Sequence, residues 1–161
     1  MTAHEIPNFG VLLAPFISQV PAEARPRFLA LLERGAADRY REWAAMLPLY
    51  QDELLRCAER EDEIADRIEA RFALDRSLVD IVRAPVPGAR DTYYGVFAGL
   101  DVWDQLRIQA GAERQGAQAW RTIAAGVTDP DVVEELARCS ALEEESADRL
   151  DRLITHHTGA R

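Results

Sequence analysis

The stretch EREDEIADRI, from Glu59 to Ile68, returns in altered form as LEEESADRL, from Leu142 to Leu150. When Glu61 is aligned with Glu143, the two stretches read E-x-x-I-A-D-R and E-x-x-S-A-D-R. Helices that bind a pair of metal ions inside a four-helix bundle often carry E-x-x-H at this position. The glutamate is present in both copies and the histidine in neither. The chain therefore raises the question of a metal site without its nitrogen ligands.

The composition predicts one globular domain over residues 1–161, with 48% hydrophobic and 29% charged residues. The net charge of −9 argues against nucleic acid or an anionic membrane surface as a partner, because both need basic patches. No apolar run approaches the ~20 residues that span a bilayer. The first residues lack the basic region of a signal peptide, so we expect a cytoplasmic protein.

Strong helix formers dominate the chain, strand signals are nearly absent, and apolar residues recur at steps of three and four. These features predict an all-α protein. Five helices are expected, over about 22–46, 49–71, 75–83, 92–126 and 130–156. The stretch 84–91 contains proline and glycine and is predicted to be a loop. Residues 1–20 are predicted to form an apolar arm that packs on the bundle.

The connection between the second and third long helices is long and carries its own short helix. A simple up-down-up-down bundle needs only a short loop at this point, whereas a ferritin-like bundle needs a long crossover. We therefore predict a ferritin-like four-helix bundle built from two helical hairpins.

The two hairpins are also predicted to be repeats of each other. In the first helix of each hairpin, a glutamate is followed seven residues later by an aromatic residue, as Glu33–Tyr40 and Glu113–Trp120. The two halves of this pattern are 80 residues apart, and the glutamates of the opening stretches are 82 residues apart. Two features at nearly the same offset favour an internal duplication. Coincidence in a chain rich in alanine, glutamate and arginine is the alternative.

Apolar positions surround the repeated glutamates, so all of them are expected to point into the bundle at mid-helix: Glu33, Glu61, Glu113 and Glu143. An unpaired buried carboxylate costs several kcal/mol or takes up a proton. Three arrangements can offset that cost, namely two divalent cations, protonation, or inward arginines such as Arg34, Arg67 or Arg149.

A metal site is the more specific interpretation. A dinuclear carboxylate site takes one glutamate from each of two helices and an E-x-x-H motif from each of the other two. The four glutamates fit the carboxylate positions, but Ile64 and Ser146 occupy the histidine positions. Magnesium and manganese accept shells made only of oxygen, and iron accepts such a shell with weaker binding.

The stretch ERGAADRYREWAAMLPLYQDELLRCAEREDEI, Glu33 to Ile64, resembles the ferritin-like superfamily and most closely the aldehyde-deformylating oxygenases. The first glutamate, the tyrosine, the LP pair and the next glutamate stand at the family's spacing, and the second half of the chain is a weaker match. The resemblance implies a di-iron or similar dinuclear centre that activates oxygen beside an apolar channel for a fatty aldehyde. It implies metal ligands at Glu33, Glu61, Glu113 and Glu143.

The remaining cysteines and histidines are not expected to complete the site. Cys57 and Cys139 each lie four residues before a core glutamate and are predicted to be small core residues. They are expected not to form a disulfide, because the helices that carry them run antiparallel in a ferritin-like bundle. His156 and His157 lie more than two turns beyond Ser146, too far to replace the absent ligands.

Two functions of different classes follow. The absent histidines favour a metal-free bundle that serves as a binding or scaffold module, or as a cofactor-independent catalyst. The retained glutamates favour the alternative, an oxidoreductase with an all-carboxylate dinuclear iron or manganese site. Two kinds of partner remain possible from the sequence: further copies of the chain in a homo-oligomer, and an apolar small molecule in the bundle core.

Overall fold

The computed structural model describes residues 5–159, which contain helices and no strand. The long helices are α2 (Arg25–Met46), α3 (Gln51–Arg71), α6 (Val102–Ala125) and α7 (Pro130–Gly159). The shorter α-helices are α1 (Phe9–Ile17), α4 (Val79–Arg83) and α5 (Val86–Gly95). Short 3₁₀ turns cover Ala22–Ala24, Pro48–Tyr50 and Arg76–Leu78. The all-α prediction is confirmed, and none of the described helices has the length and apolar character needed to cross a membrane.

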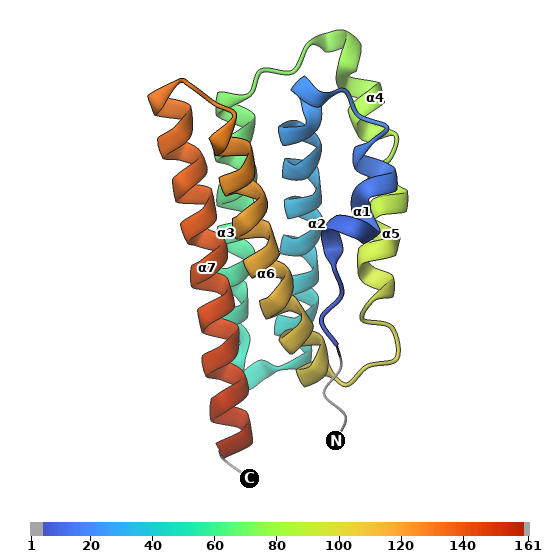
Figure 1. The fold of residues 1–161 in the computed structure, drawn as a ribbon. Coiled ribbons are helices and arrows are strands. Elements are labelled where there is room, and N and C mark those ends of the chain that lie inside the picture. The colour runs from blue at the N-terminus through green and yellow to red at the C-terminus, as the bar shows by residue number, and fades with distance from the viewer. Residues whose placement is uncertain (1–4, 160–161) are drawn as a thin grey trace.

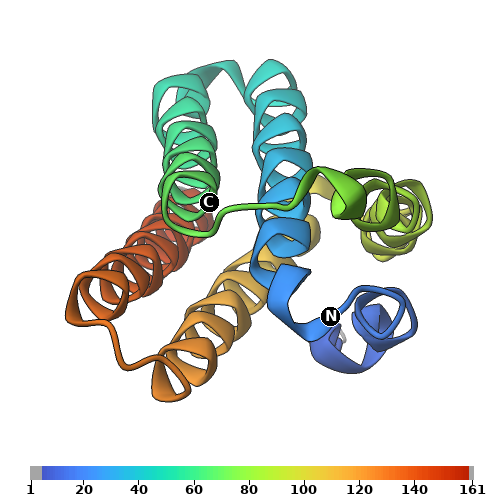
Figure 2. The ribbon, with the colours of Figure 1, turned by 90° about the horizontal axis from the view of Figure 1, so that it is seen from above.

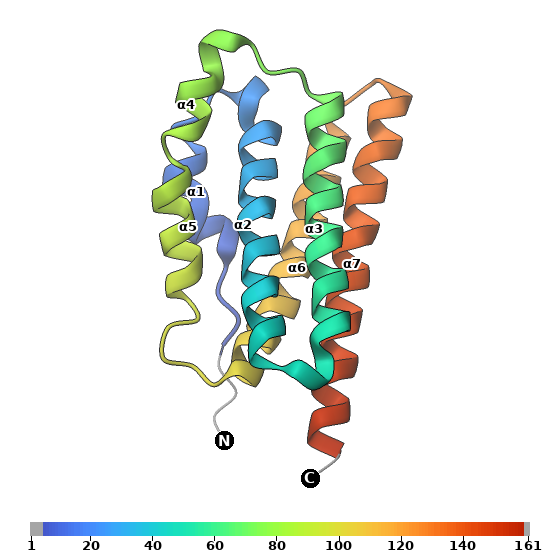
Figure 3. The same cartoon turned by 180° about the vertical axis from the view of Figure 1, so that it is seen from behind.

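The four long helices lie side by side, and the connection from α3 to α6 returns along the outside of the bundle (Figure 1). Helices α2 and α7 run in one direction, and α3 and α6 run in the other, as Figures 1 and 3 both show. Figure 2 shows that α1 and α5 lie together on one side of the bundle, next to α2. One side of the bundle therefore carries an additional layer that the other side lacks.

Local sequence signals place the ends of the long helices. Pro26 lies in the first turn of α2, where a missing N–H group costs nothing, and Pro48 lies two residues after Met46, the last residue of α2. The side chain of Asp101 caps α6 by accepting a hydrogen bond of 2.9 Å from the Trp103 amide. The two prolines were expected at these ends, whereas the cap at Asp101 was not, because residue 101 falls inside the helix predicted over 92–126.

The prediction of a loop over 84–91 is wrong, because α5 covers most of this stretch. Pro85 caps α5 and a second proline lies in its first turn, where the φ angle of proline suits a helix. The third long helix begins at Val102 instead of residue 92, because Gly99 interrupts the chain with a φ of +74°. A residue with a Cβ atom rarely adopts that angle.

The N-terminal arm is described from residue 5 onward, and residues 1–4 lie outside the described part. It contains α1, which packs against α5. Gln115 of α6 accepts a hydrogen bond of 2.9 Å from the Phe9 amide and donates one of 2.8 Å to the Pro7 carbonyl. These two bonds attach the arm to the bundle beside the repeated glutamates.

Two clusters of buried apolar residues fill the interior of the bundle. One cluster contains Ala37 of α2 and Ala110 of α6. The other contains Ala30 of α2 and Trp120 of α6. The repeated glutamates lie between these positions on their helices. The bundle therefore contains a polar layer enclosed by two apolar ones.

Candidate metal centre

Each long helix contributes one repeated glutamate to the same cavity wall: Glu33 from α2, Glu61 from α3, Glu113 from α6 and Glu143 from α7. Glu61 and Glu113 are 1% exposed and Glu143 is 2% exposed, whereas Glu33 is half-buried beside the cavity. The structure thus brings the four predicted residues together at the centre of the bundle.

Three of the four carboxylates form a tight group. Glu33, Glu61 and Glu143 each offer an oxygen atom, and these oxygens lie within 4.8 Å of one another. Neither oxygen of Glu61 accepts a hydrogen bond from an amide, hydroxyl, ring or guanidinium donor of residues 5–159. A buried carboxylate without such donors needs a proton or a cation.

Glu113 lies beside this group but has a different environment. Its Oε1 atom accepts a hydrogen bond of 2.5 Å from the Tyr40 hydroxyl and one of 2.6 Å from Nε2 of Gln109. The hydroxyl group of Tyr93, on α5, donates a hydrogen bond of 2.6 Å to Oε1 of Gln109 and so orients that amide. The other oxygen of Glu113 has no hydrogen-bond partner among the described residues.

Glu143 is seated against α6. Nε1 of Trp120 donates a hydrogen bond of 3.0 Å to its Oε1 atom. Gly116 faces the same carboxylate so closely that a Cβ atom placed there would lie 2.5 Å from that oxygen. A glycine inside a helix is unfavourable by about 1 kcal/mol relative to alanine, and here it leaves room for the carboxylate.

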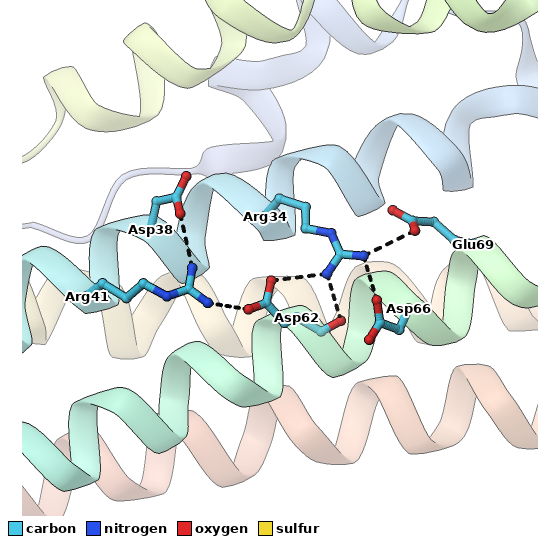
Figure 4. A network of polar contacts seen from close by, with 6 residues as sticks. All are labelled: Arg34, Asp38, Arg41, Asp62, Asp66 and Glu69. Atoms are coloured by element: carbon cyan, nitrogen blue, oxygen red, sulfur yellow. Dashed lines mark hydrogen bonds and ion pairs between the residues drawn. The ribbon is translucent and has the colours of Figure 1, made fainter.

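No arginine of the described chain pairs with the four core glutamates, so the inward-arginine alternative is wrong. Arg34 instead binds Asp62, Asp66 and Glu69 on the outer face of α2 and α3 (Figure 4). Arg67 pairs with Glu63 and Glu135, and Arg149 with Glu53. Long arginine side chains keep their charged ends near water while their stems cover apolar surface.

Burial and crowding shift the ionisation of this layer. Burial raises the pKa of Glu33 to about 7. Burial also raises the pKa of Glu61 and of Glu143 well above the ordinary value, and repulsion from neighbouring glutamates adds to both shifts. Burial likewise raises the pKa of Tyr40, so its hydroxyl stays protonated and acts as a donor to Glu113.

The positions of the absent histidines are fully buried. Ile64 and Ser146 are both 0% exposed, and the hydroxyl oxygen of Ser146 has no hydrogen-bond partner among the described residues. His157 stacks on Trp103 with ring centroids 3.8 Å apart, and His156 contacts Tyr50. As expected, the histidines at the end of α7 do not replace the absent ligands.

Cys57 and Cys139 are buried with free thiols, and they belong to different apolar clusters of the bundle. Burial raises the pKa of each thiol to about 12, and neither belongs to the group of candidate ligands. A protonated buried thiol is a small core residue and not a ligand at neutral pH.

A cavity of about 190 Å³ lies between the glutamates and the layer formed by α1 and α5. Most of its walls are apolar, with Leu13 and Ile17 from α1, Leu32 from α2, and Val86 and Ala89 from α5. Four uncharged or basic polar side chains also reach the cavity: Arg90, Tyr93, Gln109 and Gln115. The cavity thus joins an apolar space to the carboxylate layer.

Sequence reasoning missed three residues that shape the site: Tyr93, Gln109 and Gly116. Gln109 lies four residues before Glu113 on α6, which is a signal that the helical period offers. Gly116 is a glycine in the middle of a long helix, which is unusual enough to mark a close approach. Tyr93 comes from the crossover, and no local pattern relates it to α6.

No protein-family model, curated protein or solved structure matches the chain. The donor set consists of oxygen atoms only, which suits manganese and magnesium and is accepted by iron. The two buried oxygens of Glu61 have no donor partner among residues 5–159, so they are available as ligands. The residues present therefore fit a divalent cation.

Proposed function

We propose that the chain is a ferritin-like four-helix bundle that binds divalent iron or manganese through its core glutamates. We further propose that it acts as an oxidoreductase on a small apolar molecule. One observation carries this proposal: Glu33, Glu61 and Glu143 converge within 4.8 Å in the core, with no arginine of the described chain to compensate them. The long crossover and the parallel directions of α3 and α6 support the ferritin-like topology.

The roles of the chain's own residues follow from their positions. Glu33, Glu61 and Glu143 would hold the cation, and a bound iron or manganese ion supplies electron-transfer chemistry that these side chains lack. Tyr40 holds a proton at its hydroxyl oxygen, 2.5 Å from Glu113. The apolar walls of the cavity bind the hydrocarbon part of a ligand and exclude water from the carboxylates.

Metal binding is tested by anaerobic loading with Fe(II) or Mn(II), followed by desalting and elemental analysis. The parent protein should retain metal, and Glu61→Gln should weaken binding more than about a hundredfold, because removing a ligand costs more than removing an outer-shell partner. Glu144→Gln is the matched control, since Glu144 is the neighbour of Glu143 but pairs with Arg121 at the surface. Equal metal retention by parent and Glu61→Gln would contradict the proposal.

The oxidoreductase step is tested by exposing the iron-loaded protein to air and recording the absorbance of Fe(III). Oxidation in the parent should be faster than for the same iron in buffer, and Glu61→Gln should oxidise iron at the buffer rate. Identical rates for the parent and for buffer would leave metal binding in place but remove the redox assignment.

A metal-free binding module is the second candidate, favoured by the buried Ile64 and Ser146 at the histidine positions. Octanal serves as the probe, with thermal unfolding of the metal-free protein as the measurement. Ala119→Trp should reduce the stabilisation by octanal because Ala119 lines the cavity, whereas Gln118→Trp, one residue away, should not. Octanal binding together with no retention of metal would favour this candidate over the oxidoreductase.

A further inference from the structure

We infer that the site holds one divalent cation tightly, at Glu33, Glu61 and Glu143, and that Glu113 is not a ligand of that cation. This inference rests on the proposed function and deepens it. The resemblance noted in the sequence implies two metal ions on four equivalent glutamates. In the structure, three of these carboxylates form one group, and the carboxylate of Glu113 lies outside it.

Geometry separates Glu113 from the other three glutamates. Oxygens of Glu33, Glu61 and Glu143 all lie within 4.8 Å of one another, a spacing that one central cation can span. Glu113 does not belong to this group, although it lines the same cavity. Among residues 5–159 the cluster therefore offers one position with three carboxylates, and no second group of three candidate ligands is present there.

Hydrogen bonding also distinguishes Glu113 from the other three core glutamates. One oxygen of Glu113 accepts two short hydrogen bonds, from Tyr40 at 2.5 Å and Gln109 at 2.6 Å. Such bonds stabilise the negative charge of a carboxylate and make it a weaker partner for a cation. Glu61 accepts no hydrogen bond from a neutral or cationic donor of residues 5–159. A bound cation therefore stabilises the carboxylate of Glu61 more than that of Glu113.

The amide of Gln109 is held in the orientation that favours Glu113. Because Tyr93 donates to its oxygen at 2.6 Å, its NH₂ group faces Glu113. Rotation of the amide would place two oxygens against each other. The crossover thus reinforces the donor set of Glu113 from outside the bundle.

The ligands that would complete a second position are absent. Ile64 cannot ligate a cation, and Ser146 offers a neutral hydroxyl in place of an imidazole. A second cation would depend on the remaining oxygen of Glu113 and on sharing Glu143 with the first. Two divalent cations so placed would repel each other without enough negative charge between them.

Titration of the metal-free protein with Mn(II) under anaerobic conditions tests the inference, with equilibrium dialysis and electron paramagnetic resonance as the measurements. We expect one tightly bound Mn(II) per chain, with the spectrum of an isolated ion, and further Mn(II) left in solution. Two Mn(II) per chain with an exchange-coupled spectrum would overturn the inference and leave the proposed function intact. No bound Mn(II) would overturn the inference, and no bound Fe(II) in the same titration would overturn the proposed function as well.

Three variants extend the test. Glu113→Gln should weaken Mn(II) binding less than about tenfold, whereas Glu61→Gln should weaken it more than about a hundredfold. A loss in Glu113→Gln as large as that in Glu61→Gln would show that Glu113 is a ligand. Tyr40→Phe removes one donor from Glu113 without altering its charge. It should also retain one tightly bound Mn(II), so the test does not depend on whether Glu113→Gln folds.

Discussion

The hairpins α2–α3 and α6–α7 carry the same pattern of glutamates and aromatic residues but surround those glutamates differently. In the first hairpin, Glu33 and Glu61 receive no hydrogen bond from a tyrosine, tryptophan or glutamine of residues 5–159. In the second, Glu113 receives two such bonds and Glu143 receives one. Equivalent positions in a predicted duplication therefore do not have equivalent chemistry.

The difference comes from neighbouring positions that the two hairpins do not share. Four residues before its glutamate, α6 has Gln109, whereas α2 has the apolar Leu29. Three residues after it, α6 has Gly116, whereas α2 has Ala36. In addition, the layer of α1 and α5 covers only one side of the bundle (Figure 2). The environment of each core glutamate is therefore set by these neighbours and not only by its place in the repeated pattern.

Restoring the histidines adds the same nitrogen ligand to both hairpins and has the largest expected effect. The double variant Ile64→His with Ser146→His places an imidazole one turn from Glu61 and from Glu143. Binding of Fe(II) should tighten by about a hundredfold, because each imidazole adds a ligand of the kind that iron prefers, and two ions per chain should bind. Elemental analysis measures both effects.

A control variant, Ile64→Leu with Ser146→Ala, changes the same positions without adding a ligand. It should bind iron as the parent does. If the histidine variant folds and shows no gain over this control, the glutamates do not form a shared site.

The pH dependence of stability should reveal the uncompensated carboxylates. Because the pKa of Glu33 is raised to about 7 by burial, the folded metal-free protein retains a proton that the unfolded chain releases above its ordinary value of 4.5. This stabilisation is complete below pH 4.5 and is lost as the pH rises through about 7. Urea unfolding should show a loss of about 1–3 kcal/mol across this window.

Two comparisons check the origin of this pH dependence. In Glu33→Gln the slope should be smaller, since one of the carboxyl groups with a raised pKa is gone. With saturating Mn(II) the trend should reverse, because protons and the cation compete for the same oxygens. A metal-free protein that becomes more stable over this range would contradict the assignment.

Alanine substitutions at two glycines form a matched pair with a smaller expected effect on metal binding. Alanine at Gly116 would clash with the Glu143 carboxylate, whereas alanine at Gly35 would contact only the flexible Arg90 side chain, at 3.7 Å. Gly116→Ala should weaken Mn(II) binding about tenfold by displacing Glu143. Gly35→Ala should leave binding unchanged and raise stability by about 0.5–1 kcal/mol. Equal Mn(II) affinity in the two variants would show that Gly116 does not position Glu143.

The two cysteines test whether α3 and α7 run antiparallel, and oxidation is expected to form no disulfide between them. Cys57 and Cys139 each precede a core glutamate by four residues, or ~6 Å along a helix. On the antiparallel α3 and α7 these offsets point to opposite ends of the site, ~12 Å apart, beyond the ~7 Å reach of a disulfide. Mass spectrometry of oxidised, denatured protein should find both thiols unlinked. A Cys57–Cys139 bridge would require parallel helices.

The sequence was sufficient to predict the all-α class and the inward direction of the glutamates, because both follow from helical periodicity. It was not sufficient for α5, since prolines at the start of a helix resemble those of a loop. Of the two donors to Glu113, Gln109 is signalled by its place four residues earlier on the same helix, whereas Tyr40 comes from another helix and no local pattern relates it to Glu113. Tyr93 meets Gln109 only through tertiary packing, and arginines reach their partners through long flexible side chains.

The ladder of ion pairs between α2 and α3 includes Arg34 and Arg41, which both bind Asp62 (Figure 4). The sequence contains no lysine, so each of its 19 basic side chains other than histidine is an arginine. A guanidinium group keeps its charge in alkaline solution, where an ammonium group would lose it. It also does not react with the reagents that label amines. The outer face of this hairpin should therefore keep its charge pairs at high pH, and side-chain amine chemistry has no target on the chain.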